Sequence, residues 1–276
     1  MFASGKFTVI AALHLPPFPA SANPARRENP DSHAERPTAS LSAITEYAIR
    51  NTQHAYAAGL RALYLQDLGD YPVAPTVQPH TVAGVTAVGV ALRREFPDLQ
   101  LGVCLMSHGA KEPLAIAQAI GAQFVRLKVY VGAMVKAEGI LQGCAHEAIQ
   151  YRAQIQADGV AILADVYDRT GEPLGRRPLA EEARQAATFG RADGLVLTGR
   201  SLDESVEMLK EVREARVGVP ILLGGGATAE NVRRFRELAE GVIVSTAFKA
   251  KGGWSRESLA ADWDEGKIEA FMRAVV

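Results

Sequence analysis

Two cations, Arg126 and Lys128, stand two residues apart in the short apolar run "FVRLKV". Side chains two apart along a strand share a face, so both point the same way from a strand whose other face is apolar. Cations inside a protein need anionic partners, and Asp165, in the run "AILADVY", is the counter-charge that we expect for Lys128. A lysine beside a carboxylate serves as an acid, a base, a Schiff-base nucleophile or an anion clamp. The residues by themselves leave these roles open.

His14 and Asp67 end two further apolar runs. Together with Asp165 they offer either a general base pair or ligands for a hard divalent cation. We predict catalytic roles for Lys128, Asp165, Asp67 and His14 without a cofactor. A divalent metal held by His14, Asp67 and Asp165 is the alternative.

The stretch "PILLGGGATAEN" places Gly224, Gly225 and Gly226 between an apolar run and an expected helix with Thr228 as its N-cap. Such a turn is either a packing device or a set of bare backbone N–H groups facing an anion. The next run ends in "STAFK", which supplies two hydroxyls and a cation. We predict a phosphate site from these two strand ends, with Gly224, Gly225, Gly226, Ser245, Thr246 and Lys249 as its residues.

The elements that must position these residues alternate regularly. Eight short apolar runs are each followed by a helical pattern, which is typical of a parallel sheet covered on both faces. We predict an α/β fold, a single (β/α)8 TIM barrel over residues 1–276, and rank a doubly wound open sheet second. The predicted strands are 8–15, 62–67, 99–105, 124–129, 161–167, 194–199, 220–225 and 241–248, and the predicted helices are 41–58, 79–95, 110–120, 143–157, 178–189, 203–214, 228–238 and one after Arg256.

A barrel carries its active site where the strands end, at their C-terminal side. That rule brings the residues above to one rim. Arg126 is one of these rim candidates, and the rule adds three more: Thr198, Asp168 and Arg169.

The proline-rich segment 16–40 follows the first predicted strand and contains six prolines. A long segment without secondary structure in a compact domain often serves as a functional lid. We therefore expect it to be a mobile lid over the mouth of the barrel.

Composition excludes several classes of function. The 276 residues carry a formal net charge of −1, which argues against nucleic-acid binding, and two cysteines are too few for a disulfide framework. No apolar run reaches the length of a membrane span. Residues 6–22 imitate a secretion signal, but the short run Thr8–Leu15 reads better as a buried strand, so we expect a cytoplasmic protein. The sequence gives no clear oligomer signal, and a homo-oligomer is compatible with it.

Several segments, in order, resemble the BtpA/SgcQ family. They are "ALHLPPFP", "LQDLGDYP", "GAQFVRLKVYVGAMVKAEGILQG", "ILADVYD", "ADGLVLTG" and "GGGATAENV" with "GVIVSTAFKAKG", and the resemblance runs from about residue 9 to 253. The resemblance implies a TIM barrel. One branch of the family is linked to photosystem I biogenesis, another to sugar utilisation, and many members are labelled by analogy with phosphoribosylanthranilate isomerase.

This chain departs from the family pattern at three places. It has "VCLMSHG" instead of an Asn-rich segment, Lys128 instead of Asn, and Tyr167, Asp168 and Arg169 where a Lys-His pair is typical. We expect an enzyme of a divergent subgroup that acts on a small phosphorylated metabolite, either a phosphosugar or a nucleotide-derived compound, with lyase, isomerase or aldolase-like chemistry. The alternatives are a non-catalytic assembly or biogenesis factor and, third, a metal-dependent hydrolase.

Overall fold

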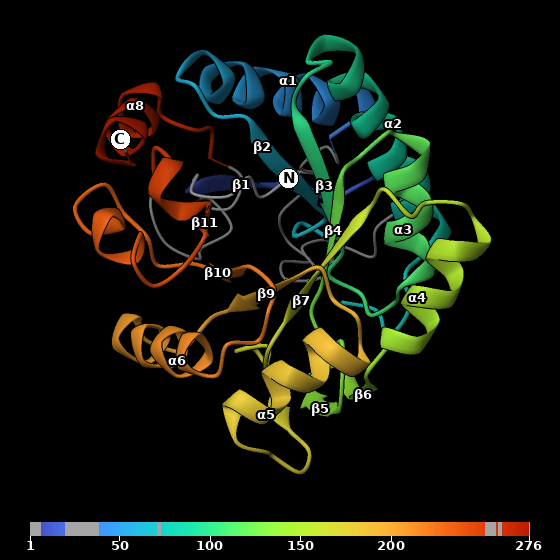
Figure 1. Cartoon of the computed structure of the whole chain (residues 1–276). Coiled ribbons are helices and arrows are strands. Elements are labelled where there is room, and N and C mark those ends of the chain that lie inside the picture. Colours follow the sequence, from blue (N-terminus) through green and yellow to red (C-terminus); the bar gives the residue numbers. More distant parts are fainter. Residues whose placement is uncertain (1–6, 20–38, 71–72, 252–257, 259–260, 276) are drawn as a thin grey trace, which may run out of the picture.

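Eight parallel strands close into a barrel, which confirms the predicted fold (Figure 1). A computed structural model describes residues 7–19, 39–70, 73–251, 258 and 261–275 of the chain. The strand order around the barrel is β1-β11-β10-β9-β7-β4-β3-β2. The strands are β1 (Thr8–His14), β2 (Ala62–Gln66), β3 (Gln100–Cys104), β4 (Phe124–Leu127), β7 (Ala161–Asp165), β9 (Gly194–Leu197), β10 (Ile221–Leu223) and β11 (Gly241–Val244).

The strands are almost completely buried because one face fills the barrel and the other packs on helices. Alternate residues form an interior cluster that includes Ile10, Tyr64, Phe124 and Leu163. Phe124 lies on the same face of its strand as Arg126, two residues later. The interior is therefore a packed apolar core that gives way to polar side chains toward the C-terminal ends of the strands.

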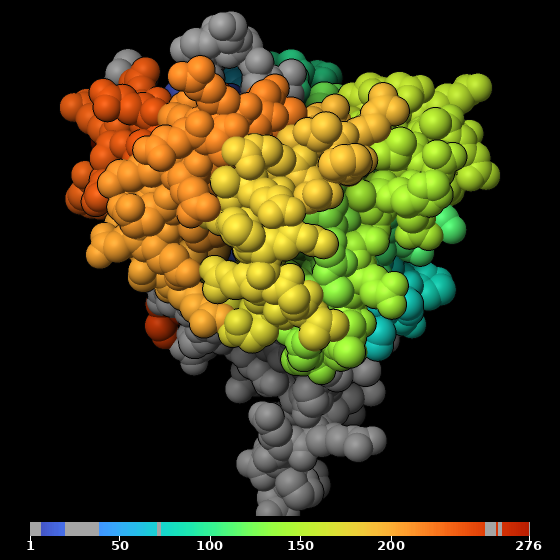
Figure 2. Space-filling view, turned by 60° about the horizontal axis from the view of Figure 1, so that its bottom comes forward, coloured from blue at the N-terminus to red at the C-terminus, as the bar shows by residue number. Residues whose placement is uncertain are grey.

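The helices cover the outside of the barrel in chain order (Figure 1). In Figure 2 the yellow residues around α5 lie between the orange residues around α6 and the yellow-green residues of α4, β5 and β6. The last turn of α5 widens into a short π-helix, η2 (Gln185–Phe189). The α-helices are α1 (Leu41–Ala57), α2 (Pro79–Glu95), α3 (Lys111–Ala119), α4 (Ala145–Gln154), α5 (Leu179–Arg184), α6 (Leu202–Glu214) and α8 (Glu265–Val275).

The segments after β10 and β11 differ from the prediction. The helix expected over 228–238 is only a short 3-10 helix, η3 (Val232–Phe235). The Asn231 side chain accepts from the Thr228 N–H at 2.7 Å and donates to the Gly226 carbonyl at 3.0 Å, a local arrangement that competes with an α-helix. The strand expected over 241–248 stops at Val244 and is followed by the 3-10 helix η4 (Thr246–Phe248).

A second, small sheet was not predicted from the sequence. Strands β5 (Ala133–Lys136), β6 (Gly139–Gln142) and β8 (Glu172–Pro173) pair antiparallel in the order β6-β5-β8. It joins the loop after β4 to the loop after β7, and the Gly143 N–H closes its base by donating to the Gly132 carbonyl at 2.7 Å. Each strand is too short to give a clear alternation of apolar and polar residues.

The first residues of the predicted lid are anchored. The Phe18 N–H donates to Asp70 Oδ1 at 2.9 Å, and its ring is buried. The Gly69 N–H donates to the Leu15 carbonyl at 3.1 Å, so "HLPPF" and "QDLGD" interlock. Most of the predicted lid, residues 20–38, lies outside the described residues.

None of the helices formed by the described residues is both long enough and apolar enough to cross a membrane.

Candidate active site

A cavity of about 250 Å³ opens at the C-terminal ends of the barrel strands. Its size suits a small ligand. Most of the residues predicted for the site line it, and they come from β1, β4, β7, β9, β10, β11 and the loops that follow. The polar and glycine residues of this mouth cavity are His14, Tyr64, Gln66, Arg126, Lys128, Asp165, Asp168, Arg169, Thr170, Thr198, Gly224, Gly225, Gly226, Ser245 and Thr246.

The three consecutive glycines have three different roles. A Cβ on Gly224 would lie 1.8 Å from Thr198 Oγ1, so this position admits no side chain. The Gly224 N–H is already used, because it donates to the Leu197 carbonyl at 2.8 Å. Gly226 has a φ of +84°, a turn conformation that glycine adopts without strain. Gly225 has open space in front of it.

The rim candidate Thr198 lies beside the predicted phosphate residues and has an unsatisfied hydroxyl. Thr198 is 7% exposed, and its Oγ1 has no hydrogen-bond partner among the described residues. The N–H groups of Gly225 and Gly226 also make no hydrogen bond to any residue that the structure describes. Ser245 and Thr246 complete this wall. A buried polar group without a partner is costly, and a bound ligand would satisfy it.

Two features of the predicted phosphate site are wrong. The helix expected to direct its N-terminus at the anion is not formed, because η3 has only four residues. Lys249 is fully buried and does not line the cavity. Its backbone pairs with Trp263. Its ammonium is close enough to lower the pKa of His14, so its charge affects the site although its side chain does not line the cavity.

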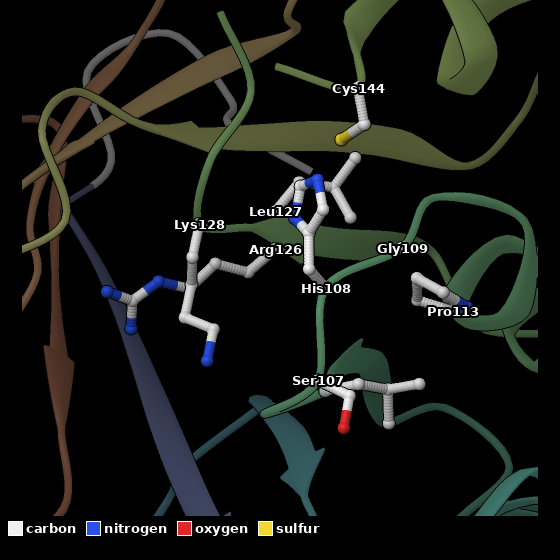
Figure 3. Close-up of a pocket in the computed structure, with 9 residues that line it drawn as sticks. Ser107, His108, Gly109, Pro113, Arg126, Leu127, Lys128 and Cys144 are labelled. Atoms are coloured by element: carbon white, nitrogen blue, oxygen red, sulfur yellow. The ribbon is translucent and has the colours of Figure 1, made fainter. Parts of the chain in front are cut away.

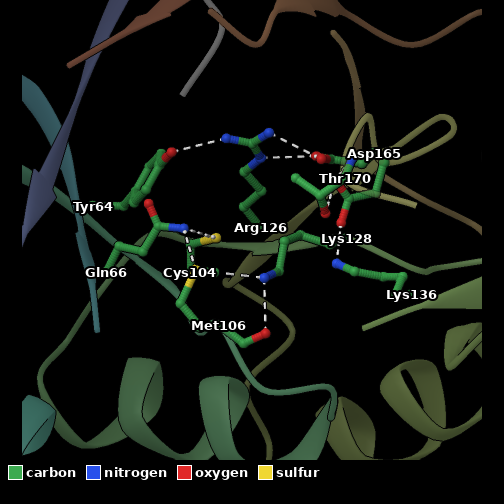
Figure 4. A network of polar contacts seen from close by, with 10 residues as sticks. Tyr64, Gln66, Cys104, Met106, Arg126, Lys128, Lys136, Asp165 and Thr170 are labelled. Atoms are coloured by element: carbon green, nitrogen blue, oxygen red, sulfur yellow. Dashed lines mark hydrogen bonds and ion pairs between the residues drawn. The ribbon is translucent and has the colours of Figure 1, made fainter. Parts of the chain in front are cut away.

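Arg126 and Asp165 form a buried, bidentate ion pair (Figure 4). Arg126 Nε donates to Asp165 Oδ1 at 2.8 Å, and Nη2 donates to Oδ2 at 2.9 Å. A third donor, Nη1, binds the Tyr64 hydroxyl at 2.8 Å. Burial alone would lower the pKa of the guanidinium, but the Asp165 carboxylate raises it well above its ordinary value.

The predicted direct pair between Lys128 and Asp165 is therefore wrong. The pairing of Leu127 with Ala164 brings the next two residues, Lys128 and Asp165, level with each other. Arg126 nevertheless binds the carboxylate. Its side chain lies on the same strand face as Lys128, and its planar guanidinium can donate to both carboxylate oxygens at once.

Lys128 and Asp67 are both tied to the backbone of Met106. Lys128 Nζ donates to the Met106 carbonyl at 2.8 Å, while the Met106 N–H donates to Asp67 Oδ1 at 2.7 Å. Asp67 is 2% exposed and does not line the cavity. It holds the backbone of Met106 through this bond and so positions the acceptor of Lys128.

Asp67 makes stability depend on pH. Burial, above all, raises the pKa of its carboxyl from 3.8 to about 6. Between these two values the folded state holds the proton more tightly than the unfolded state, so stability falls as pH rises. The shift corresponds to roughly 3 kcal/mol. Asn at this position keeps the acceptor for the Met106 N–H but cannot ionise.

We expect the free energy of unfolding of Asp67→Asn, relative to the parent, to rise by up to about 3 kcal/mol between pH 4 and pH 7. Urea denaturation of both proteins at intervals across this range measures the difference. Other titrating groups contribute equally to both and cancel. Parallel pH curves for the two proteins would show that Asp67 titrates normally.

His14 lies at the end of β1 with its ring against Ser245. Ser245 Oγ is 3.2 Å from His14 Nδ1. Burial, with the Lys249 and Arg126 charges, lowers the pKa of His14 to about 3. The imidazole is therefore neutral near pH 7, and it can orient a ligand by hydrogen bonding but adds no charge to an anion site.

Sequence reasoning missed Lys136. It ends β5 in the small sheet, and its Nζ lies 2.5 Å from Asp168 Oδ2, with both side chains 5% exposed. Asp168 Oδ1 accepts from the Thr170 N–H and hydroxyl at 3.0 and 2.9 Å. Although burial opposes it, Lys136 holds the pKa of Asp168 below its ordinary value, so this carboxylate is charged at the cavity wall. The signal in the sequence was the segment "GAMVKAEGILQG".

A second pocket of about 10 Å³ adjoins the mouth cavity on the β3–β4 side (Figure 3). That is room for about one water molecule. Arg126 and Lys128 line both spaces, and Figure 3 shows their charged ends directed away from Pro113. His108 at its rim is fixed by a 2.7 Å contact between its Nε2 and the Gln142 carbonyl.

The alternative metal site at His14, Asp67 and Asp165 is not assembled. Across the described ranges, no three His, Cys, Asp or Glu side chains gather closely enough to hold a metal ion. Asp165 is paired with Arg126, and Asp67 accepts a hydrogen bond from the Met106 N–H and does not line the cavity. This geometry removes the reason for a hydrolase at these residues.

Comparison with known proteins agrees with this architecture. The sequence profile of the BtpA family matches residues 5–276. The photosystem I biogenesis protein BtpA of Synechocystis sp. is 30% identical over 97% of this chain and 87% of its own. Two solved structures share the fold at low identity. KGPDC from Streptococcus mutans is 12% identical with a TM-score of 0.56, over 98% of this chain and 97% of its own. Phosphoribosyl anthranilate isomerase from Thermus thermophilus is 14% identical with a TM-score of 0.53, over 97% and 98%.

Proposed function

The chain belongs to the BtpA family, and we propose that it is an enzyme that acts on a small phosphorylated compound at the C-terminal mouth of the barrel. The substrate is a phosphosugar or a nucleotide-derived compound, and the chemistry is that of a lyase, an isomerase or an aldolase.

The observation that carries this proposal is the gathering of buried ionisable groups around the mouth cavity. Lys128, the Arg126–Asp165 pair and the Lys136–Asp168 pair converge from three different segments of the chain. Burying charges costs several kcal/mol for each ion, even when they are paired. Groups of this kind are typical of catalytic sites, where neighbours and burial adjust their protonation.

The opposite wall of the cavity supplies a place for a phosphate group. The neutral donors around this space are the backbone N–H groups of Gly225 and Gly226, the Thr198 hydroxyl and the Ser245 hydroxyl. The first three have no hydrogen-bond partner within the described ranges. Loops after the last two strands are where TIM barrels commonly bind phosphate. One fold neighbour supports this class of ligand, since its name, phosphoribosyl anthranilate isomerase, describes a substrate with a phosphoribosyl group.

A non-catalytic role in assembly is the second candidate. It is favoured by the 30% identity to a photosystem I biogenesis protein. A scaffold, however, has no need for charged groups buried around an internal cavity. The ligand test below separates the two roles, because a scaffold without a ligand site predicts no response.

We expect inorganic phosphate and ribose 5-phosphate to raise the melting temperature by several degrees at saturation. A ligand that binds only the folded state stabilises it by about 2.7 kcal/mol at a hundred times its Kd. The variant Thr198→Val isolates the contribution of the hydroxyl to phosphate binding. Valine has nearly the same shape, and the hydroxyl that it removes has no hydrogen-bond partner among the described residues. Its own melting temperature should be equal or higher, while its response to phosphate shrinks. Thermal scans with chloride at matched ionic strength give the baseline. Unchanged melting temperatures of the parent at saturating phosphate and sugar phosphate would contradict the proposal.

A further inference from the structure

The two lysines at the mouth differ in their partners. Lys136 is neutralised by Asp168. Lys128 Nζ is bound by the Met106 carbonyl at 2.8 Å and touches its sulfur at 3.7 Å. Among the described residues it has no carboxylate within ion-pair distance, since Arg126 occupies Asp165 and Lys136 occupies Asp168. A carbonyl orients an amine but does not supply a counter-charge.

The surroundings of Lys128 therefore favour the neutral amine. Burial is the main cause that lowers the pKa of Lys128. Cys104 opposes it, the Lys136 ammonium lowers the pKa further, and Asp168 and Asp67 raise it by smaller amounts, so the net direction is downward. A lysine that is desolvated and placed beside another cation is a typical amine nucleophile. An anion clamp, in contrast, works best as a permanent cation, which is the property of arginine.

The position of the amine fits a ligand that carries phosphate. Lys128 lines the mouth cavity from the β4 side, and the wall of neutral donors belongs to β9, β10 and β11. In the strand order, β11 lies opposite β4 and β10 is next to β11, so most of the donor wall faces Lys128 across the cavity. A ligand with a phosphate at one end can present its other end to Lys128.

We propose that Lys128 forms an imine with the carbonyl carbon of a phosphorylated aldehyde or ketone. This inference rests on the proposed function and specifies its substrate class. The amine nitrogen attacks the carbonyl carbon, and the C–N bond forms as the C=O π electrons move to oxygen. The oxygen takes up the two protons that the neutral amine nitrogen loses, the C–O bond breaks, and the oxygen leaves as water. The neutral imine then takes one proton from solvent and becomes the iminium. No oxidant or reductant takes part.

The imine is tested by reductive trapping on the intact parent protein. Glycolaldehyde phosphate, a small phosphorylated aldehyde, is added with cyanoborohydride, and the modified lysine is located by peptide mass spectrometry. The label adds the mass of the aldehyde less one oxygen atom. We expect Lys128 to react at least about tenfold faster than the exposed Lys210, because a ligand whose phosphate is bound at the opposite wall holds its carbonyl carbon beside the Lys128 amine and so raises the effective concentration there. Lys136 serves as the buried, paired comparison.

Inorganic phosphate should slow the labelling of Lys128 and leave Lys210 unaffected, and glycolaldehyde without phosphate should lose the preference for Lys128. Labelling of Lys128 no faster than Lys210 overturns the inference. In that case, a retained thermal response to phosphate that Thr198→Val reduces leaves the proposed function standing, whereas loss of both results rejects the two together.

Discussion

Replacing Lys128 by methionine is expected to abolish turnover while the barrel stays folded. Methionine keeps the length and the apolar stem, and the lost ammonium has no carboxylate partner in the described chain to leave uncompensated. A positioned acid or base contributes roughly 10²–10⁴-fold to rate, and a lost covalent step costs at least as much. Phosphate affinity should fall only in part, because its donors lie on the opposite wall.

Turnover is measured on a substrate found by screening phosphorylated metabolites. Lys128→Arg keeps the charge but should also fail, since a guanidinium neither forms an imine nor gives up a proton near neutral pH. Lys210→Met removes an exposed lysine and should match the parent. If Lys128→Met were as active as the parent, the lysine would have only a structural role.

Replacing Asp165 by asparagine is expected to lower the free energy of unfolding by about 3–5 kcal/mol, the usual cost of leaving one charge of a buried pair without its partner. The volume is unchanged, so the loss reports the charge rather than a cavity. Asp165 accepts two bonds from Arg126, and the side chains are 5% and 11% exposed. Urea denaturation at neutral pH measures the change.

Two comparisons sharpen this experiment. Glu269→Ala breaks an exposed pair with Arg273 and should cost less than about 1 kcal/mol. The double variant Arg126→Met/Asp165→Leu should recover much of the loss, because apolar groups of similar volume often replace a buried pair without penalty. A cost below about 1 kcal/mol for Asp165→Asn would mean that water reaches the pair.

Membership of the BtpA family and the barrel fold do not by themselves identify a reaction. The two solved neighbours share 12% and 14% identity with this chain, which is likeness of fold. The mouth of this barrel brings together Lys128, Asp168 and Lys136, and the imine test addresses the first of these directly.

The sequence by itself determined the barrel and the rim. A strand buried on both faces must be apolar throughout, so runs such as Thr8–His14 and Ala161–Asp165 are visible without any knowledge of their neighbours. The C-terminal ends of parallel strands meet at one edge, so polar residues at those ends were placed together correctly. His14, Asp165 and Thr198 all line the cavity for this reason.

Only the tertiary structure decided which groups bind each other. Whether Arg126 or Lys128 binds Asp165 depends on side-chain geometry across neighbouring strands, which residue spacing does not encode. Lys136 enters the site through a hairpin whose strands are too short to be recognised locally. Asp67 follows its strand like the other candidates, but it does not line the cavity. Its carboxylate accepts a hydrogen bond from the Met106 N–H instead, because a buried carboxylate needs a donor.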